Sequence, residues 1–459
     1  METTINDMVS SIERLSMASR DPNDSNKRKH NLLMSLEQQI ASVIPEGEVS
    51  TDDNEMLEVP NAVVSQIIKL DCRPIGLGDD KIEKLREIIR LAKDFIGASS
   101  SVSRSFEPFF AGTRQIVAGT CVGLGRRSLG LTTTPFDLVI VDEAARCTAS
   151  ELLVPLQASR WTVMVGDHAQ LQPHHEPAVV ERVSRELKLK RSDILVSDFE
   201  RVFCSPYAET GGFSLQRQYR MLPAINQIVS KTFYPGLNLS AGRHEPVLPP
   251  SVLEKILENE VAWVETDSLG KAGYETSPKG SSSKVNEAEA DAIVGLIEKW
   301  VADDTVARWL ESQTDYEAGI GVICMYAAQR DLLKRKLNMS CASRYLNKGL
   351  KVGTVDSYQG KENPIVILSL VRNNKNGLVV NGERSIREGF LIAPNRINVA
   401  FSRAMDRLFI VGNRNAWRPG TPIASAASEF SELASQGRAT VISADTLIDR
   451  SIGNVEQEG

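Results

Sequence analysis

Hydrophobic and polar positions divide the middle of the chain into strand-length apolar runs joined by a helical segment. Phe136–Val141 and Trp161–Val165 are apolar runs with the length of buried strands. Between them, Thr148–Gln157 has apolar residues at helical spacing, with Thr148 as its candidate cap. A strand–helix–strand unit of this size predicts two parallel strands whose carboxyl ends share one sheet edge.

The same alternation returns in the second half of the chain. The predicted helices are Glu181–Phe203, Asn286–Val301, Gln329–Leu337 and Arg396–Met405, and the predicted strands are Val261–Val264, Ile320–Met325, Lys351–Val355, Pro364–Leu370 and Arg407–Val411. This order predicts a second, mostly parallel sheet covered by helices, so the fold class is α/β with two domains. Residues 1–112 have helical periodicity and predict a small helical region, and the sequence past Asn413 predicts a short helix and a loose tail.

Composition and charge narrow the classes of function. The chain has 42% hydrophobic and 24% charged residues, which is a globular balance. Its net charge of −6 gives no overall attraction to nucleic acid, so any such binding must use a local groove. The six cysteines show no CxxC pair, which favours reduced thiols over a disulfide framework or a zinc site. No apolar run approaches the roughly 18 residues of a membrane span, so we expect an intracellular protein, cytoplasmic or nuclear.

The candidate chemistry begins where the two middle strands end. Asp142 and Glu143 follow the first strand and Asp167 follows the second, so all three are predicted at the sheet edge where α/β folds bind ligands. Carboxylates there could hold a magnesium ion and orient a water against a terminal phosphate. An isolated Val-Asp-Glu is more often a strand ending in a polar turn, but the second acidic strand end, followed by His168 and Gln170, favours the catalytic interpretation.

These segments resemble motifs of a known enzyme family. Asp-Glu-Ala-Ala at 142–145 and Gly-Asp-His-Ala-Gln-Leu at 166–171 resemble motifs II and III of superfamily 1 helicases of the Upf/senataxin-like, DNA2/NAM7-type group. Gln-Tyr-Arg-Met at 218–221, Gly353–Glu362 and Asn395–Ala404 resemble the later motifs of this group, motifs V and VI among them, in the same order. The resemblance covers roughly Thr113 to Asn413.

The resemblance implies two RecA-like domains that couple ATP hydrolysis, with Mg²⁺, to movement on single-stranded RNA or DNA. It divides the chain into the helical region 1–112, the rest of the first domain at 113–212, the second domain at 213–420 and a tail at 421–459. The resemblance assigns catalytic roles to Asp142, Glu143, Gln170, Arg220 and Arg403, and Asp142 would also bind the metal. The residues implied to bind the nucleotide are Gln170, Tyr219, Arg220, Gly360, Glu362 and Arg403. Those implied to contact the nucleic acid are Thr120, Thr354, Asp356 and Gln359. Local roles stay open as alternatives: loop capping for the motif V residues, a surface salt bridge for Arg403, and a packing turn around Thr120.

One family element has no counterpart in the sequence. No Gly-Lys-Ser/Thr tripeptide occurs, since Gly270-Lys271 is followed by Ala272 and Gly360-Lys361 by Glu362. The GxxxxGK[ST] loop normally supplies the N–H cradle, the phosphate lysine and the magnesium hydroxyl. We therefore expect little ATP hydrolysis by this chain alone, with a partner protein or an upstream segment as the source of the loop. Three functions stay open: an ATPase and helicase, a nucleic-acid-binding protein without turnover, and a scaffold subunit.

Overall fold

The computed structural model describes residues 88, 90, 114–126, 129, 131, 136–313, 319–358, 360–374, 378–380 and 383–448. The predicted helical region at 1–112 and the predicted nucleic-acid residue Gln359 lie outside the described residues, apart from two helical positions at 88 and 90. The chain divides into two compact units, residues 1–139 with 151–162 and residues 140–150 with 163–459.

Two strands form the sheet predicted in the middle of the chain. β1 (Phe136–Val141) pairs with β2 (Ser159–Met164), and α7 (Ala149–Leu156) connects them after the short 3-10 helix Ala144–Arg146. The amide of Phe136 donates to the carbonyl of Ala158, and the amide of Val165 donates to that of Val141, both at 2.8 Å. The residue numbers of the paired positions increase in the same direction along both strands, so the pair is parallel, as predicted.

The prediction that both strands are buried is wrong. Leu138, Ile140, Trp161 and Val163 are between 46% and 69% exposed. In the part of the chain that the structure describes, this sheet has two strands, and an isolated strand pair cannot cover its own faces. The buried residues of this strand–helix–strand unit include Val141, Ala144 and Ala145 at the end of β1 and the turn after it, Leu152 of α7, and Ala158 just before β2.

The predicted helix at 181–203 is three helices rather than one. α8 (Pro177–Leu187) ends at Lys188, whose φ of 53° is left-handed, and α9 (Arg191–Leu195) and α10 (Asp198–Phe203) follow. The Ser197 hydroxyl caps α10 by accepting the amide of Glu200 at 3.1 Å. Turn residues thus divide a charged segment that periodicity alone joins.

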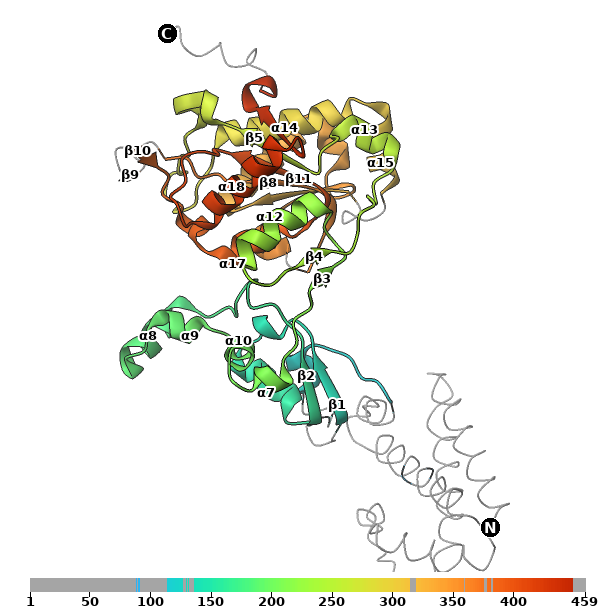
Figure 1. The fold of residues 1–459 in the computed structure, drawn as a ribbon, viewed down its shortest axis with the longest axis vertical. Coiled ribbons are helices and arrows are strands. Elements are labelled where there is room, and N and C mark those ends of the chain that lie inside the picture. Colours follow the sequence, from blue (N-terminus) through green and yellow to red (C-terminus); the bar gives the residue numbers. More distant parts are fainter. Residues whose placement is uncertain are drawn as a thin grey trace, which may run out of the picture. The chain divides into compact units, whose positions relative to one another are not determined.

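The second sheet has six parallel strands. Its strands are β5 (Val261–Glu265), β6 (Ile320–Cys324), β7 (Leu350–Thr354), β8 (Asn363–Ser369), β11 (Ala404–Gly412) and β12 (Ala439–Ser443). The order is β12-β5-β11-β8-β6-β7, and every pair is parallel. Figure 1 shows β5, β8 and β11 of this sheet among the helices that surround it. The predicted α/β class with parallel sheets is confirmed.

Helices cover both faces of this sheet. α13 (Pro250–Ile256), α14 (Glu287–Val301), α15 (Asp304–Ser312) and α16 (Ala327–Asn338) supply one core, and α12 (Pro223–Phe233), α17 (Pro394–Phe401) and α18 (Pro422–Ser435) supply the other. Alternate strand residues enter alternate cores, as with Trp263 and Val264 of β5. Burial on both faces explains why these strands are continuous apolar runs.

Shorter elements complete the described chain. They are α6 (Cys121–Leu124), α11 (Ala208–Gly211), the parallel pair β3 (Arg217–Gln218) and β4 (Ser240–Ala241), the antiparallel pair β9 (Leu378–Val380) and β10 (Glu383–Ser385), and the 3-10 helices η4 (Asp267–Gly273), η6 (Cys341–Tyr345), η7 (Val355–Tyr358), η8 (Gly389–Ile392) and η9 (Ala444–Thr446).

Two predicted elements near the end of the chain need correction. The short helix predicted past Asn413 is α18, which buries Ile423, Phe430 and Leu433, but the loose tail predicted after it is wrong for β12, which pairs with β5. The helix predicted to reach Met405 ends at Phe401, and β11 begins at Ala404.

A buried carboxylate lies where β8 ends. Glu289 of α14 is fully buried, and its Oε2 accepts the amide of Val371 at 2.8 Å and the hydroxyl of Ser369 at 2.7 Å. Val371 has a φ of 69°, a strained conformation for a β-branched residue. Burial raises the pKa of Glu289 to about 8, so the neutral acid holds this turn at neutral pH.

This burial predicts a pH-dependent stability. The folded protein holds a proton on Glu289 that the unfolded chain, with an ordinary glutamate pKa, releases; stability is therefore greatest below the ordinary pKa and falls as pH rises towards about 8. Each pH unit in that window should cost up to about 1.4 kcal/mol. Denaturant unfolding at several pH values should show a flatter dependence for Glu289→Gln than for wild type. Glu254→Gln, an exposed change on α13, should keep the wild-type slope, and an identical slope in all three proteins would refute the assignment.

Candidate nucleotide site

The predicted acidic residues lie together at one edge. Asp142 directly follows β1, and its Oδ1 accepts the amide of Glu143 at 2.9 Å. Glu143 has a left-handed φ of 55°, an uncommon conformation for a non-glycine residue that is enriched at functional sites. A Cβ on Gly166 would lie 2.8 Å from the amide nitrogen of Ala145, so glycine permits the two strand ends to meet. Asp167 thereby reaches the same edge, as predicted.

The segment 167–170 is held by α17 and by the turn after it. The Gln170 side chain donates to Asp167 Oδ2 at 2.7 Å, and its Oε1 accepts Nη2 of Arg403 at 2.7 Å. The Nδ2 of Asn395 donates to the carbonyls of His168 at 2.9 Å and of Gln170 at 2.6 Å. Gln170 and Arg403, which are 233 positions apart in the sequence, are therefore direct neighbours.

Two residues that the sequence analysis missed complete this attachment. The Tyr234 hydroxyl donates to Asp167 Oδ2 and accepts Nδ2 of Asn398 at 2.8 Å, and the same amide group reaches the carbonyl of Ala169 at 2.9 Å. Burial, and then the charge of Asp167, raise the pKa of Tyr234, which keeps the phenol a donor. No local pattern in the sequence signals that Tyr234 and Asp167, 67 positions apart, are partners.

Arg403 is the buried cation of the site. It is 2% exposed, and its guanidinium also donates to the carbonyls of Val399 at 3.2 Å and Lys361 at 3.1 Å. Burial lowers its pKa to about 10, followed by repulsion from Arg220, while the charge of Glu143 opposes the shift. Arg403 stays protonated at neutral pH and lies close enough to both charges to be influenced by them. The alternative of a surface salt bridge does not fit this burial.

Arg220 lies beside Arg403. Its Nε donates to Glu362, and its Nη1 donates to the carbonyl of Ser402 at 3.2 Å. Both side chains of this ion pair are partly exposed, at 32% and 42%, so a ligand could compete for either. Arg243 fixes the backbone behind them, since it donates to the carbonyl of Arg220 and pairs with the buried Asp406 at 2.7 Å. Sequence reasoning did not find Arg243 or Asp406.

The remaining predicted nucleotide residues are more exposed. Tyr219 is 65% exposed, and its ring lies against Gly242, where a Cβ would come within 2.6 Å of it. Gly360 has a φ of 75°, which favours glycine, and is exposed. An exposed tyrosine next to Arg220 presents a flat ring that could face a base.

Asp142 could take part in magnesium binding without a preformed protein cage. The described residues include no group of three or more His, Cys, Asp or Glu side chains that could hold a metal. Mg²⁺ commonly takes one or two carboxylates, keeps several waters and uses substrate phosphates for the rest of its shell. A single carboxylate at a strand end therefore fits this ion.

Among the predicted nucleic-acid residues, Thr354 and Asp356 are not gathered with the arginines. Thr120 caps α6 by accepting the amide of Gly123 at 3.1 Å. Thr354 ends β7, and Asp356 follows it and pairs with Arg396 at 3.2 Å. These motif V residues lie at the carboxyl edge of the six-stranded sheet, whereas Glu362 and Arg403 directly precede β8 and β11 at its amino edge.

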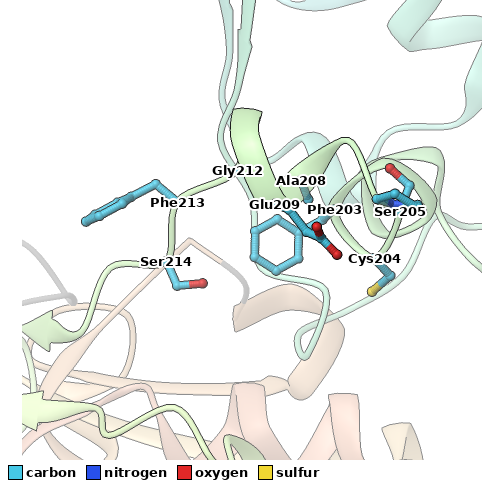
Figure 2. Close-up of a pocket in the computed structure, with 9 residues that line it drawn as sticks. Phe203, Cys204, Ser205, Ala208, Glu209, Gly212, Phe213 and Ser214 are labelled. Atoms are coloured by element: carbon cyan, nitrogen blue, oxygen red, sulfur yellow. The ribbon is translucent and has the colours of Figure 1, made fainter.

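A surface pocket of about 440 Å³ lies elsewhere in the same unit. Figure 2 shows it between α10, α11 and the segment after them. Phe203, Cys204, Glu209 and Phe213 are among its lining residues, and none of the predicted site residues is. The pocket is therefore distinct from the cluster around Arg403.

Known families match most of the chain. Two family models, each described as an AAA domain, match residues 4–175 and 195–415. The first match includes the motifs at 142–145 and 166–171, and the second includes those at 218–221, 353–362 and 395–404. The chain has a superfamily 1 helicase core of the Upf1/Sen1-like group.

Curated relatives are longer than this helicase core. A regulator of nonsense transcripts 1 homolog of Arabidopsis thaliana is 28% identical over 68% of the chain and 22% of its own length. The ATP-dependent helicase upf1 of Schizosaccharomyces pombe is 28% identical over 65% of the chain and 28% of its own length, and helicase SEN1 of Saccharomyces cerevisiae is 24% identical over 81% and 15%. The chain thus spans less than a third of each of these proteins. A crystal structure of arterivirus nonstructural protein 10 (helicase) aligns over 64% of the chain and 42% of its own, at 16% identity and a TM-score of 0.28.

A helix that spans a membrane requires both sufficient length and sufficient hydropathy. Within the described ranges, every helix is too short or too polar to cross a bilayer.

The attachment of segment 167–170 predicts a measurable local effect. Tyr234→Phe removes the hydroxyl that links Asp167 to Asn398, so we expect the free energy of unfolding to fall by about 1–3 kcal/mol. Amide hydrogen exchange in peptides covering 165–171 should be faster than in wild type, because that loop loses one of its anchors. Tyr207→Phe, which removes a hydroxyl from a 69% exposed ring, is the matched control. Unchanged exchange in 165–171 would show that Tyr234 does not hold the loop.

Proposed function

We propose that this chain is the core of a nucleic-acid-dependent ATPase that couples ATP hydrolysis to movement on single-stranded RNA or DNA. Asp142 would contribute to binding Mg²⁺, which neutralises phosphate charge when bound. Glu143 would orient the attacking water. Gln170, Tyr219, Gly360 and Glu362 would contact the nucleotide.

The observation that supports this proposal is the proximity of a buried arginine, Arg403, both to the acidic strand end and to a second arginine. Arg403 is fixed by Gln170, influenced by the charges of Arg220 and Glu143, and buried. Although the chain has a net charge of −6, two arginines lie together here, where a triphosphate beside Asp142 would need positive charge. Arginine suits the task because its planar fork matches phosphate oxygens and stays charged.

The Arg220–Glu362 ion pair fits a role that depends on the nucleotide. In the ligand-free chain each charge satisfies the other. A bound nucleotide would offer Arg220 phosphate oxygens and would offer Glu362 ribose hydroxyls. Because both side chains are partly exposed, breaking the ion pair to make these contacts would cost little free energy.

The rest of the proposal concerns what surrounds the core. The strand would contact Thr120 in the domain at 113–212, and Thr354, Asp356 and Gln359 in the domain that begins at 213. A partner protein or another segment would provide the phosphate-binding loop, and the protein would work inside the cell, in the cytoplasm or nucleus. A second candidate, a strand-binding or scaffold protein without turnover, is favoured by the absence of Gly-Lys-Ser/Thr in the sequence.

We expect the 459-residue chain alone to hydrolyse ATP at near-background rates. Loss of phosphate positioning can raise a barrier by about 7–11 kcal/mol. A version extended at its amino terminus by a phosphate-binding loop should gain strand-stimulated hydrolysis, measured as phosphate release. In that version Glu143→Gln should abolish turnover, and Arg403→Ala should reduce kcat by about 10³-fold or more.

Arg387→Ala is the matched control for Arg403, since it removes an exposed arginine of the same domain. It should leave phosphate release at the extended protein's rate. Strand-stimulated hydrolysis by the unextended chain that disappears in Glu143→Gln would contradict the expected need for the loop.

We also expect weak, salt-sensitive binding of single-stranded nucleic acid. Contacts to phosphates release counterions, so the affinity should fall steadily as salt rises, with a slope of about −0.7 per phosphate contacted. Fluorescence anisotropy with a labelled oligonucleotide across a salt series measures this slope. An affinity independent of salt, or no binding at low salt, would favour the scaffold alternative.

A further inference from the structure

The six-stranded sheet has a topological switch point that the arginine cluster does not use. β6 and β8 are neighbours, but the chain leaves β6 for α16 on one face and leaves β8 for α17 on the other. Open α/β sheets bind ligands beyond the carboxyl ends of two strands that diverge in this way. Arg220, Glu362 and Arg403 gather instead at the amino ends of β8 and β11. The carboxyl edge between β6 and β8 is therefore a separate candidate site.

Two aromatic rings and an arginine lie at this point. Tyr326, just after β6, and Phe390 of η8 have ring centroids 5.2 Å apart at an interplanar angle of 29°. The guanidinium carbon of Arg396, on α17, lies 5.1 Å from the centroid of Phe390. Tyr326 is 5% exposed, but Phe390 is 52% exposed and its neighbour Ile392 is 56% exposed. We call Tyr326, Phe390 and Arg396 the switch-point platform.

The backbone around the platform is built to hold Phe390 in place. Gly389 has a φ of 58°, and a Cβ there would lie 2.6 Å from the Tyr326 hydroxyl, so only glycine lets the rings approach. The segment before it is fixed by Arg372, whose Nε and Nη2 donate to the carbonyl of Arg387 at 2.8 and 2.6 Å. Arg372 is itself paired with Glu275 at 3.1 Å. An exposed ring is thus held by buried polar groups.

The charges at the platform favour a flat ring over a phosphate. Arg396 is paired with Asp356 at 3.2 Å, so its charge is already compensated and the pair offers no net positive charge to a phosphate. What the platform offers is an aromatic face, a guanidinium plane and adjacent apolar surface. Nucleobases stack on such groups in single-strand-binding proteins, largely irrespective of sequence.

We propose that Phe390, supported by Tyr326 and flanked by Arg396, stacks a base of the bound single strand. Thr354 ends β7, the neighbour of β6, so the motif V residues proposed to contact the strand lie on the same edge. This inference rests on the proposed strand binding and adds to it a base contact that carries no sequence preference.

The test is anisotropy binding of the full chain to labelled oligothymidylate and to the same backbone with abasic sugars. Phe390→Ala should weaken binding of the normal strand by about 5- to 100-fold. Its salt dependence should be unchanged, because no phosphate contact is lost. On the abasic strand wild type and Phe390→Ala should bind alike, since there is no base to stack. Phe390→Trp should restore normal binding.

Controls separate a failed platform from a failed function. Met339→Ala removes an 89% exposed apolar side chain from the same domain and should change neither affinity. If wild type binds the normal strand and Phe390→Ala binds it equally well, the platform is refuted while strand binding stands. If Phe390→Ala loses the same affinity on both strands, the ring has a structural role and the proposal is also refuted. No binding by wild type at low salt would refute the proposed strand binding itself.

Discussion

The arrangement of the site depends on satisfying one buried cation. A guanidinium that is 2% exposed must find acceptors inside the protein, because an unpaired buried charge is costly. Arg403 finds them in the Gln170 side chain and in the carbonyls of Val399 and Lys361. These three acceptors come from distant parts of the sequence. The need to satisfy Arg403 therefore fixes the segment after β2, the end of α17 and the approach to β8 relative to one another.

Neutral side chains around Arg403 reinforce this arrangement. Asn395, Asn398 and Tyr234 donate to the segment 167–170 without adding charge. The positive field of Arg403 and Arg220 is therefore opposed by Glu143 and Glu362 rather than cancelled on every side. Arg403 is held by its protein acceptors, whereas a ligand could compete for the partly exposed Arg220.

Charged side chains and aromatic side chains lie at opposite ends of the strands of the six-stranded sheet. Glu362 and Arg403 precede strands, whereas Thr354 and the switch-point platform follow them. The turn after β8 supports the second edge, since Glu289 holds Val371 in a strained conformation and the next residue, Arg372, holds the segment before Phe390. The parallel sheet thus has charged residues at the amino ends of its strands and the aromatic platform at their carboxyl ends.

The sequence by itself predicted β1, β2, the five strands β5, β6, β7, β8 and β11 of the larger sheet, and the acidic strand ends, because apolar periodicity and motif spacing are local properties. It identified the helicase family for the same reason, since Asp142, Gln170, Arg220 and Arg403 occur in runs of characteristic order. It did not predict β12 or the helices α12, α13 and α15. It failed where tertiary context decides: periodicity could not show that β1 and β2 are largely exposed or that α18 is buried.

Only the tertiary structure could decide which of these residues meet. The contacts of Arg403 with Gln170, of Tyr234 with Asp167 and of Phe390 with Tyr326 each join segments more than 60 positions apart. Pairing over such distances depends on strand order and helix packing, which no local pattern encodes.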